Sequence, residues 1–79
     1  MFIRKLRPNE RAPVTVDRIC IDRLPDGMIT WSGSVRVGNT ILTSNGRAMF
    51  GTVQEAETDG INWARGHGTS QLLIDVSAA

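Results

Sequence analysis

Residues 28–50, MITWSGSVRVGNTILTSNGRAMF, decide the fold, because apolar side chains alternate with polar ones along the stretch and two turn signals interrupt it. Gly38-Asn39 suits a two-residue hairpin loop, in which glycine accepts the left-handed backbone conformation. Asn45-Gly46 is the strongest short hairpin signal that a sequence offers. We therefore expect three consecutive antiparallel strands within this stretch.

The register that these two turns impose sorts the apolar residues onto two faces of the sheet. A two-residue loop at each turn places Leu42 opposite both Val35 and Met49, on the face that a helix would cover. The same register places Ile41 opposite Phe50 on the other face. With a single helix available, we expect Ile41 and Phe50 to form an uncovered apolar patch.

The sequence on the N-terminal side adds one more long strand and a basic segment. Residues 14–23 alternate with a one-residue phase slip, which is typical of a β-bulge. Residues 24–27, Leu-Pro-Asp-Gly, supply turn chemistry before the next strand. Residues 1–13 hold two prolines, and we expect a basic arm or a short edge strand there, anchored by Phe2 and Leu6.

On the C-terminal side the apolar period changes from that of a strand to that of a helix. Residues 52–55, Thr-Val-Gln-Glu, match the capping box that opens a helix. Ala56, Gly60 and Ala64, spaced by four, would form a row of small side chains and let the helix approach the sheet closely. Residues 71–76 alternate again and predict a final strand.

These elements predict an α+β fold of two layers. The expected order is an antiparallel β-meander of about four strands, one helix and a final strand (ββββαβ), with the helix packed on one sheet face. We expect residues 1–13 to be the arm or edge strand and residues 14–79 to be a single domain, with Trp31 in its core. The length of 79 residues permits one small core.

Composition excludes several classes of protein. Cys20 is the sole cysteine, so no internal disulfide can form, which favours a reducing compartment. No apolar run reaches the length of about 20 residues that spans a bilayer, and residues 1–7 are too charged for a signal peptide. We therefore expect a cytoplasmic protein that does not bind membranes.

The chain offers few groups for catalysis or for metal binding. His67 and Cys20 are the only residues of their kinds, and together they cannot complete a zinc site of nitrogen and sulfur ligands. The glycines match neither a Walker loop nor a dinucleotide-binding fingerprint. We expect no enzymatic activity, no metal and no cofactor. The alternative, a catalytic base at His67, lacks an orienting partner and a nucleophile.

Positive charge is concentrated at the N-terminus, where residues 1–23 hold six of the nine cationic side chains. They have three interpretations: contact with nucleic-acid phosphates, contact with an acidic protein, or a solvated arm whose arginines pair with Glu10, Asp17 and Asp22. The candidate protein-binding residues combine basic side chains with the expected apolar patch: Arg4, Lys5, Arg7, Arg11, Arg18, Ile41 and Phe50.

The hypothesis that follows is a small protein-binding module without enzymatic activity, regulatory or inhibitory, whose partner is another protein or a second copy in a homodimer. By size and character alone it is similar to the small inhibitors encoded by phages and mobile elements, a class that includes anti-defence proteins such as anti-CRISPRs. The alternative is a nucleic-acid-binding domain that uses the basic N-terminal segment, with affinity that falls steeply as salt is raised.

Overall fold

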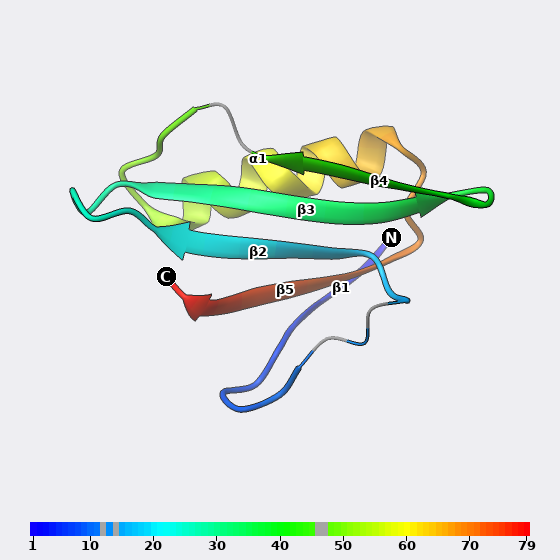
Figure 1. Ribbon diagram of the computed structural model, residues 1–79, viewed down its shortest axis with the longest axis horizontal. Coiled ribbons are helices and arrows are strands. Elements are labelled where there is room, and N and C mark those ends of the chain that lie inside the picture. Colours follow the sequence, from blue (N-terminus) through cyan, green and yellow to red (C-terminus); the bar gives the residue numbers. More distant parts are fainter. Residues whose placement is uncertain (12, 14, 46–47) are drawn as a thin grey trace.

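The computed structural model describes residues 1–11, 13, 15–45 and 48–79. These residues form a five-stranded sheet with one helix lying across one of its faces (Figure 1). The elements, in chain order, are β1 (Phe2–Lys5), β2 (Arg18–Arg23), β3 (Ile29–Val37), β4 (Thr40–Asn45), α1 (Val53–Gly66) and β5 (Gln71–Ala78). The α+β class and the packing of the helix on the sheet are confirmed.

The strands lie in the order β1-β5-β2-β3-β4, which makes the sheet mixed. β2, β3 and β4 are antiparallel neighbours, whereas β5 lies parallel to both β1 and β2. The expected pure antiparallel meander is therefore wrong. The physical reason is the crossover: α1 carries the chain back along the sheet, so β5 enters from the same end as β2 and pairs with it in parallel.

The first of the two expected hairpins is confirmed. Val37 lies opposite Thr40 and Val35 lies opposite Leu42, as a two-residue loop requires. Gly38 has a φ of 61°, a conformation that glycine adopts without strain. The β3–β4 pair therefore has the register that its turn dictates.

The second expected hairpin is wrong. Gly46 lies outside the described residues, but Asn45 before it and Phe50 after it both pair with β3. Asn45 belongs to the β3–β4 ladder, and Phe50 exchanges two backbone hydrogen bonds with Ile29 at the start of β3. Both sides of the expected turn thus lie along the same edge of β3. Phe50 consequently shares a face with Ile29 and is not the partner of Ile41.

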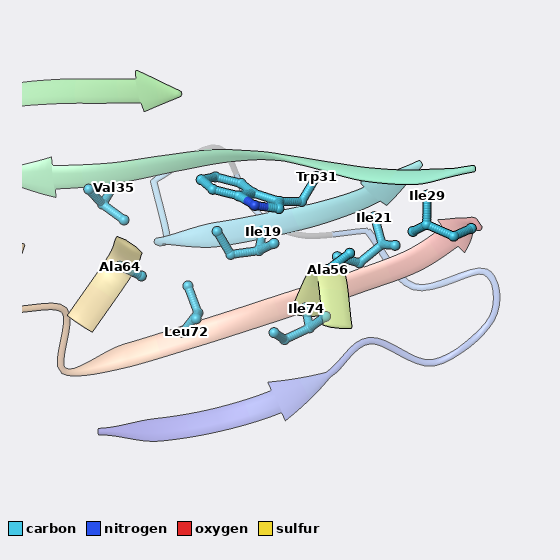
Figure 2. Close-up of a cluster of buried hydrophobic side chains, with 9 residues drawn as sticks. All are labelled: Ile19, Ile21, Ile29, Trp31, Val35, Ala56, Ala64, Leu72 and Ile74. Atoms are coloured by element: carbon cyan, nitrogen blue, oxygen red, sulfur yellow. The ribbon is translucent and has the colours of Figure 1, made fainter. Parts of the chain in front are cut away.

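The core lies between the helix and the sheet (Figure 2). Apolar side chains of the middle strands point toward the helix, where small side chains of α1 meet them. The buried members are Ile19, Ile21, Ile29, Trp31, Val35, Ala56, Ala64, Leu72 and Ile74. Gly60 completes the row of small residues on the helix, since a Cβ there would lie 2.9 Å from Cγ2 of Ile19. The expected close approach of helix and sheet is therefore confirmed.

Trp31 joins the two layers by a polar contact as well as by burial. Its indole Nε1–H donates to Oδ2 of Asp59 on α1 at 2.7 Å, and its ring packs on Trp63 with centroids 5.3 Å apart. The helix begins as its capping box predicts, because the N–H of Glu55 donates to Oγ1 of Thr52 at 3.1 Å. Within the described part of the chain, no helix combines the length and the apolar character needed to cross a membrane.

Candidate functional site

The sheet face opposite the helix is polar along its middle strands. Side chains alternate along β2, so Cys20 points away from the face that Ile19 and Ile21 occupy. Cys20 pairs with Ser32 on β3 and with Asp75 on β5, which puts the three side chains next to one another. The centre of this face is thus lined by a thiol, a hydroxyl and a carboxylate.

The two residues of the expected apolar patch lie apart. Phe50 packs against the buried core, so its placement on the helix-free face is corrected. Ile41 is 54% exposed on β4, opposite Arg36. The error comes from the second hairpin, whose register placed Phe50 across from Ile41. The two side chains therefore form no common surface.

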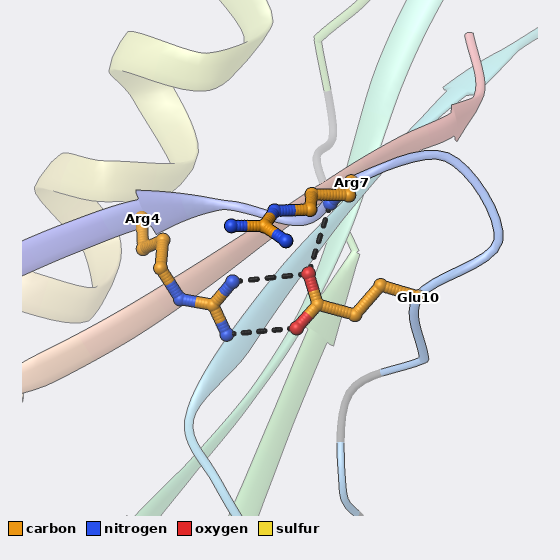
Figure 3. Close-up of polar contacts among 3 residues, drawn as sticks. All are labelled: Arg4, Arg7 and Glu10. Carbon is orange, nitrogen blue, oxygen red and sulfur yellow. Dashed lines mark hydrogen bonds and ion pairs between the residues drawn. The ribbon is translucent and has the colours of Figure 1, made fainter.

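The segment after β1, residues 7–11, is an arm that Glu10 ties to the strand (Figure 3). The Arg4 guanidinium donates to both carboxylate oxygens of Glu10 at 3.0 Å, and the Arg7 backbone N–H donates to Oε1 at 3.0 Å. The hydrogen bonds from Arg4 and then from Arg7 lower the pKa of Glu10 from 4.5 to about 2. Arg4 is therefore paired within the chain, as the solvated-arm interpretation expects.

Lys5 extends to the other side of the sheet. It pairs with Ile74, whose side chain lies in the core, and its Nζ lies 3.1 Å from Oε1 of Glu57 on α1. Glu57 is only 8% exposed, and a buried carboxylate is costly without a partner of opposite charge. Lys5 supplies that partner. Lys5 therefore ties β1 to α1 and does not share a surface with the arginines of the arm.

A hollow of about 560 Å³ lies between the arm and the helix-free face of the sheet. Its lining residues are Asn9, Glu10, Arg11, Arg18, Cys20, Asp75 and Ser77. Two arginines thus face two carboxylates, and the lining carries no excess charge. The structure brings Arg11 and Arg18 to this hollow together with Glu10, which the solvated-arm interpretation names as a partner, and Asp75, which it does not name. Arg4 and Arg7 hydrogen-bond to Glu10 of the same lining.

The titratable groups of the hollow favour a structural role over nucleophilic chemistry. Hydrogen bonds from the hydroxyl and the backbone N–H of Ser77 hold the pKa of Asp75 below its usual range. Burial, and then the charge of Asp75, raises the pKa of the Cys20 thiol. Since the thiolate is the reactive form of cysteine, Cys20 is less reactive here than a free cysteine in water.

The outer edge of β1 exposes apolar side chains. Met1, Phe2 and Ile3 are 45%, 81% and 44% exposed, and β1 is the terminal strand of the sheet. The expectation that both Phe2 and Leu6 anchor this segment is half wrong, because only Leu6, at 7% exposed, is buried. A four-residue strand is too short for its alternation to tell which side chains face the core.

His67 follows the last residue of α1, where its N–H donates to the Ala64 carbonyl oxygen at 3.0 Å. Its ring meets the ring of Trp63 edge-on, with centroids 5.2 Å apart. Within the described part of the chain, no group of three or more His, Cys, Asp or Glu side chains is placed to hold a metal ion. The position of His67 is explained by the end of the helix and by this ring contact.

Comparisons of the chain with protein-family models, with curated proteins and with solved structures found no match. The surface of the chain itself is therefore the basis on which a function can be assigned.

Proposed function

We propose that this chain is a small protein-binding module without enzymatic activity, regulatory or inhibitory, and that β1 is the centre of its contact surface. The observation that supports it is Phe2, the largest exposed apolar side chain, which is 81% exposed on a terminal strand. Open sheet edges readily pair with other chains, and charged side chains protect them. Arg4 and Lys5 are such charges on β1, but Phe2 and Ile3 beside them stay exposed. An aromatic side chain at such an edge favours a contact with another protein.

The ion pairs favour a protein partner over a nucleic acid. Arg4 and Lys5 each face a carboxylate of the same chain, so they contribute less to an attraction for phosphates than their sequence indicates. Proteins that bind single-stranded nucleic acids also stack bases on exposed aromatic side chains. Trp31, Phe50 and Trp63 pack with the core instead, which leaves Phe2 as the exposed aromatic residue.

In-cell photo-cross-linking tests this function at the level of single positions. A photoreactive phenylalanine analogue replaces Phe2 in one variant and Ile41 in a matched control variant, since Ile41 is an exposed apolar residue on the opposite edge. After irradiation of cells that produce the chain, we expect one predominant protein adduct from position 2 and little from position 41.

Two results would contradict the proposal. One is equal adduct formation from both positions, which would indicate unspecific collision with abundant proteins. The other is an adduct that nuclease treatment removes, which would assign the basic segment to nucleic acid. An adduct between two copies of the chain would keep protein binding and identify the partner as a homodimer.

A further inference from the structure

A smaller hollow, of about 220 Å³, lies over the middle strands on the helix-free face of the sheet. Side chains of β2, β3 and β4 on that face line it: Arg18, Cys20, Ser32, Ser34, Thr43 and Asn45. Among the described residues of this lining, Arg18 is the one that carries a charge. The smaller hollow is therefore positive, and no carboxylate of its own lining offsets that charge.

The strand register brings the donors of the smaller hollow together. Arg18 lies opposite Ser34, and Ser34 lies opposite Thr43. Residues that face each other on neighbouring strands share a face of the sheet, so the guanidinium and these two hydroxyls are neighbours. The next row on the same face consists of Cys20, Ser32 and Asn45.

These donors are not used within the described part of the chain. The two ion pairs found there involve other residues, so Arg18 has no carboxylate partner in it. The hydroxyls of Ser32, Ser34 and Thr43 likewise form no hydrogen bond with the described residues. A hydroxyl rotates to suit its acceptor, and a guanidinium presents several N–H groups in a fixed fork. The set can therefore donate to an oxyanion in the smaller hollow.

The number of donors favours a phosphoryl group over a carboxylate. The terminal phosphate of a monoester has three acceptor oxygens and a charge between one and two at neutral pH. Arginine binds phosphate through two parallel hydrogen bonds, and such charge-assisted bonds are about twice as strong as neutral ones. The remaining oxygens would accept from Ser34 and Thr43.

The larger hollow described above adjoins the smaller one, because Arg18 and Cys20 line both. Its lining includes the carboxylates of Glu10 and Asp75, which repel an anion but accept hydrogen bonds from hydroxyl groups. A ligand that spans both hollows would place its anionic end over β3 and β4. Its uncharged, hydroxyl-bearing end would lie beside Asp75.

We propose that the two hollows together bind a small phosphomonoester with a hydroxyl-bearing body. Arg18, Ser34 and Thr43 hold the phosphoryl group, and Asp75 accepts a hydrogen bond from the body. The site lies on the middle strands and does not use β1, so it goes beyond the proposed protein-binding function and is independent of it.

NMR titration of the full chain tests the site with three probes: glycerol phosphate, inorganic phosphate and glycerol. Both phosphates should shift the Arg18 side-chain signal and the amide signals around the smaller hollow. Glycerol phosphate should bind about three-fold more tightly than inorganic phosphate, because its hydroxyls reach Asp75, and glycerol alone should cause no shift. Absence of shifts with both phosphates at millimolar concentration would overturn the proposal. Equal affinity for the two would overturn the place given to the body.

Variants of the chain separate this site from general attraction between charges. Arg18→Gln should weaken binding of glycerol phosphate about ten-fold, and Ser34→Ala about three-fold. Arg36→Gln is the matched control, because Arg36 is an exposed cation on the same face of β3 but does not line the smaller hollow. It should bind like the parent chain. Equal losses in the two arginine variants would overturn the site, and Ser34→Ala keeps the test decisive if Arg18→Gln fails to fold.

Two further measurements distinguish the site from other functions of the chain. A short single-stranded oligonucleotide should not displace glycerol phosphate, and displacement at lower concentration than inorganic phosphate requires would assign the hollow to nucleic acid and overturn the small ligand. Phe2→Ser should leave binding of glycerol phosphate unchanged. Arg18→Gln should leave the cellular cross-link from position 2 intact, so failure of either proposal does not remove the other.

Discussion

The two edges of the sheet, β1 and β4, expose different groups although each has a neighbour on one side only. On β4 the exposed side chains are the polar Thr40, Thr43 and Asn45 and the apolar Ile41, which is 54% exposed. On β1 they include Phe2 and Ile3. β4 is joined to β3 by a two-residue hairpin loop, whereas β1 pairs with the far end of the chain. The mostly polar edge β4 is thus held by a local turn, whereas β1, which exposes Phe2 and Ile3, depends on long-range contacts.

The edge that exposes Phe2 and Ile3 is also the edge with fewer contacts to the rest of the chain. β1 has four residues, all exposed, and its anchors are the Leu6 side chain, the ladder to β5 and the ion pair of Lys5. Segments with few buried contacts open more readily than the core. A partner strand on the outer side would add the contacts that β1 lacks.

The largest expected effect comes from the contact between the helix and the sheet, which supports β1 and β4 equally. Ile19→Ala removes a fully buried side chain from beneath Gly60 and should lower the free energy of unfolding by about 3 kcal/mol. Urea denaturation should show one cooperative transition at a lower midpoint, with both edges lost together. Separate transitions for β1 and β4 in this variant would contradict a single core.

A smaller effect should separate the two edges. Leu6→Ala removes the buried anchor of β1 and should cost about 2 kcal/mol in the stability of that strand. Hydrogen exchange should accelerate in β1 and along the adjoining side of β5, while the β3–β4 ladder keeps its protection. Equal acceleration in β4 would show that β1 is not an independent weak edge.

The next effect concerns the arm and appears at low pH. Because the pKa of Glu10 is about 2 in the folded chain and 4.5 otherwise, its stabilising contribution is fully present above about pH 4.5 and is lost as pH falls toward 2. A carboxyl titration followed by NMR should give this low value. Arg4→Gln should return the pKa of Glu10 toward 4.5, and an unchanged value would contradict the bidentate pair.

The smallest effect on stability should belong to Phe2, the residue with the greatest proposed effect on binding. Phe2→Ser and Ile41→Ser should each change the free energy of unfolding by less than about 0.5 kcal/mol, because both side chains are exposed. A loss of 2 kcal/mol or more in Phe2→Ser alone would mean that the phenyl ring is buried within the same chain. It would then not be available to a partner.

The features that the sequence predicts correctly are those that depend on neighbours along the chain. The loop at Gly38-Asn39 sets its own register, and the capping box at residues 52–55 and the small residues that follow define the start and inner face of α1. Trp31 is in the core because an aromatic residue on the apolar face of a long strand has few other places to pack.

The features that the sequence does not predict depend on residues far apart. No local signal pairs β1 with β5, or Phe50 with Ile29. The basic residues of the candidate site are visible in the sequence, but the ion pair between Lys5 and Glu57 depends on the sheet order. The position of Phe2 on an edge strand follows only from the strand order of the sheet, in which β1 is terminal.

Amide hydrogen exchange of the free chain, measured residue by residue by NMR, tests most directly whether the outer side of β1 is open. We expect fast exchange at Ile3 and Lys5 and slower exchange at Arg4 and Leu6, whose N–H groups face β5. Strong protection of Ile3 and Lys5 in the free monomer would show that the edge is already covered and would contradict the contact surface described above.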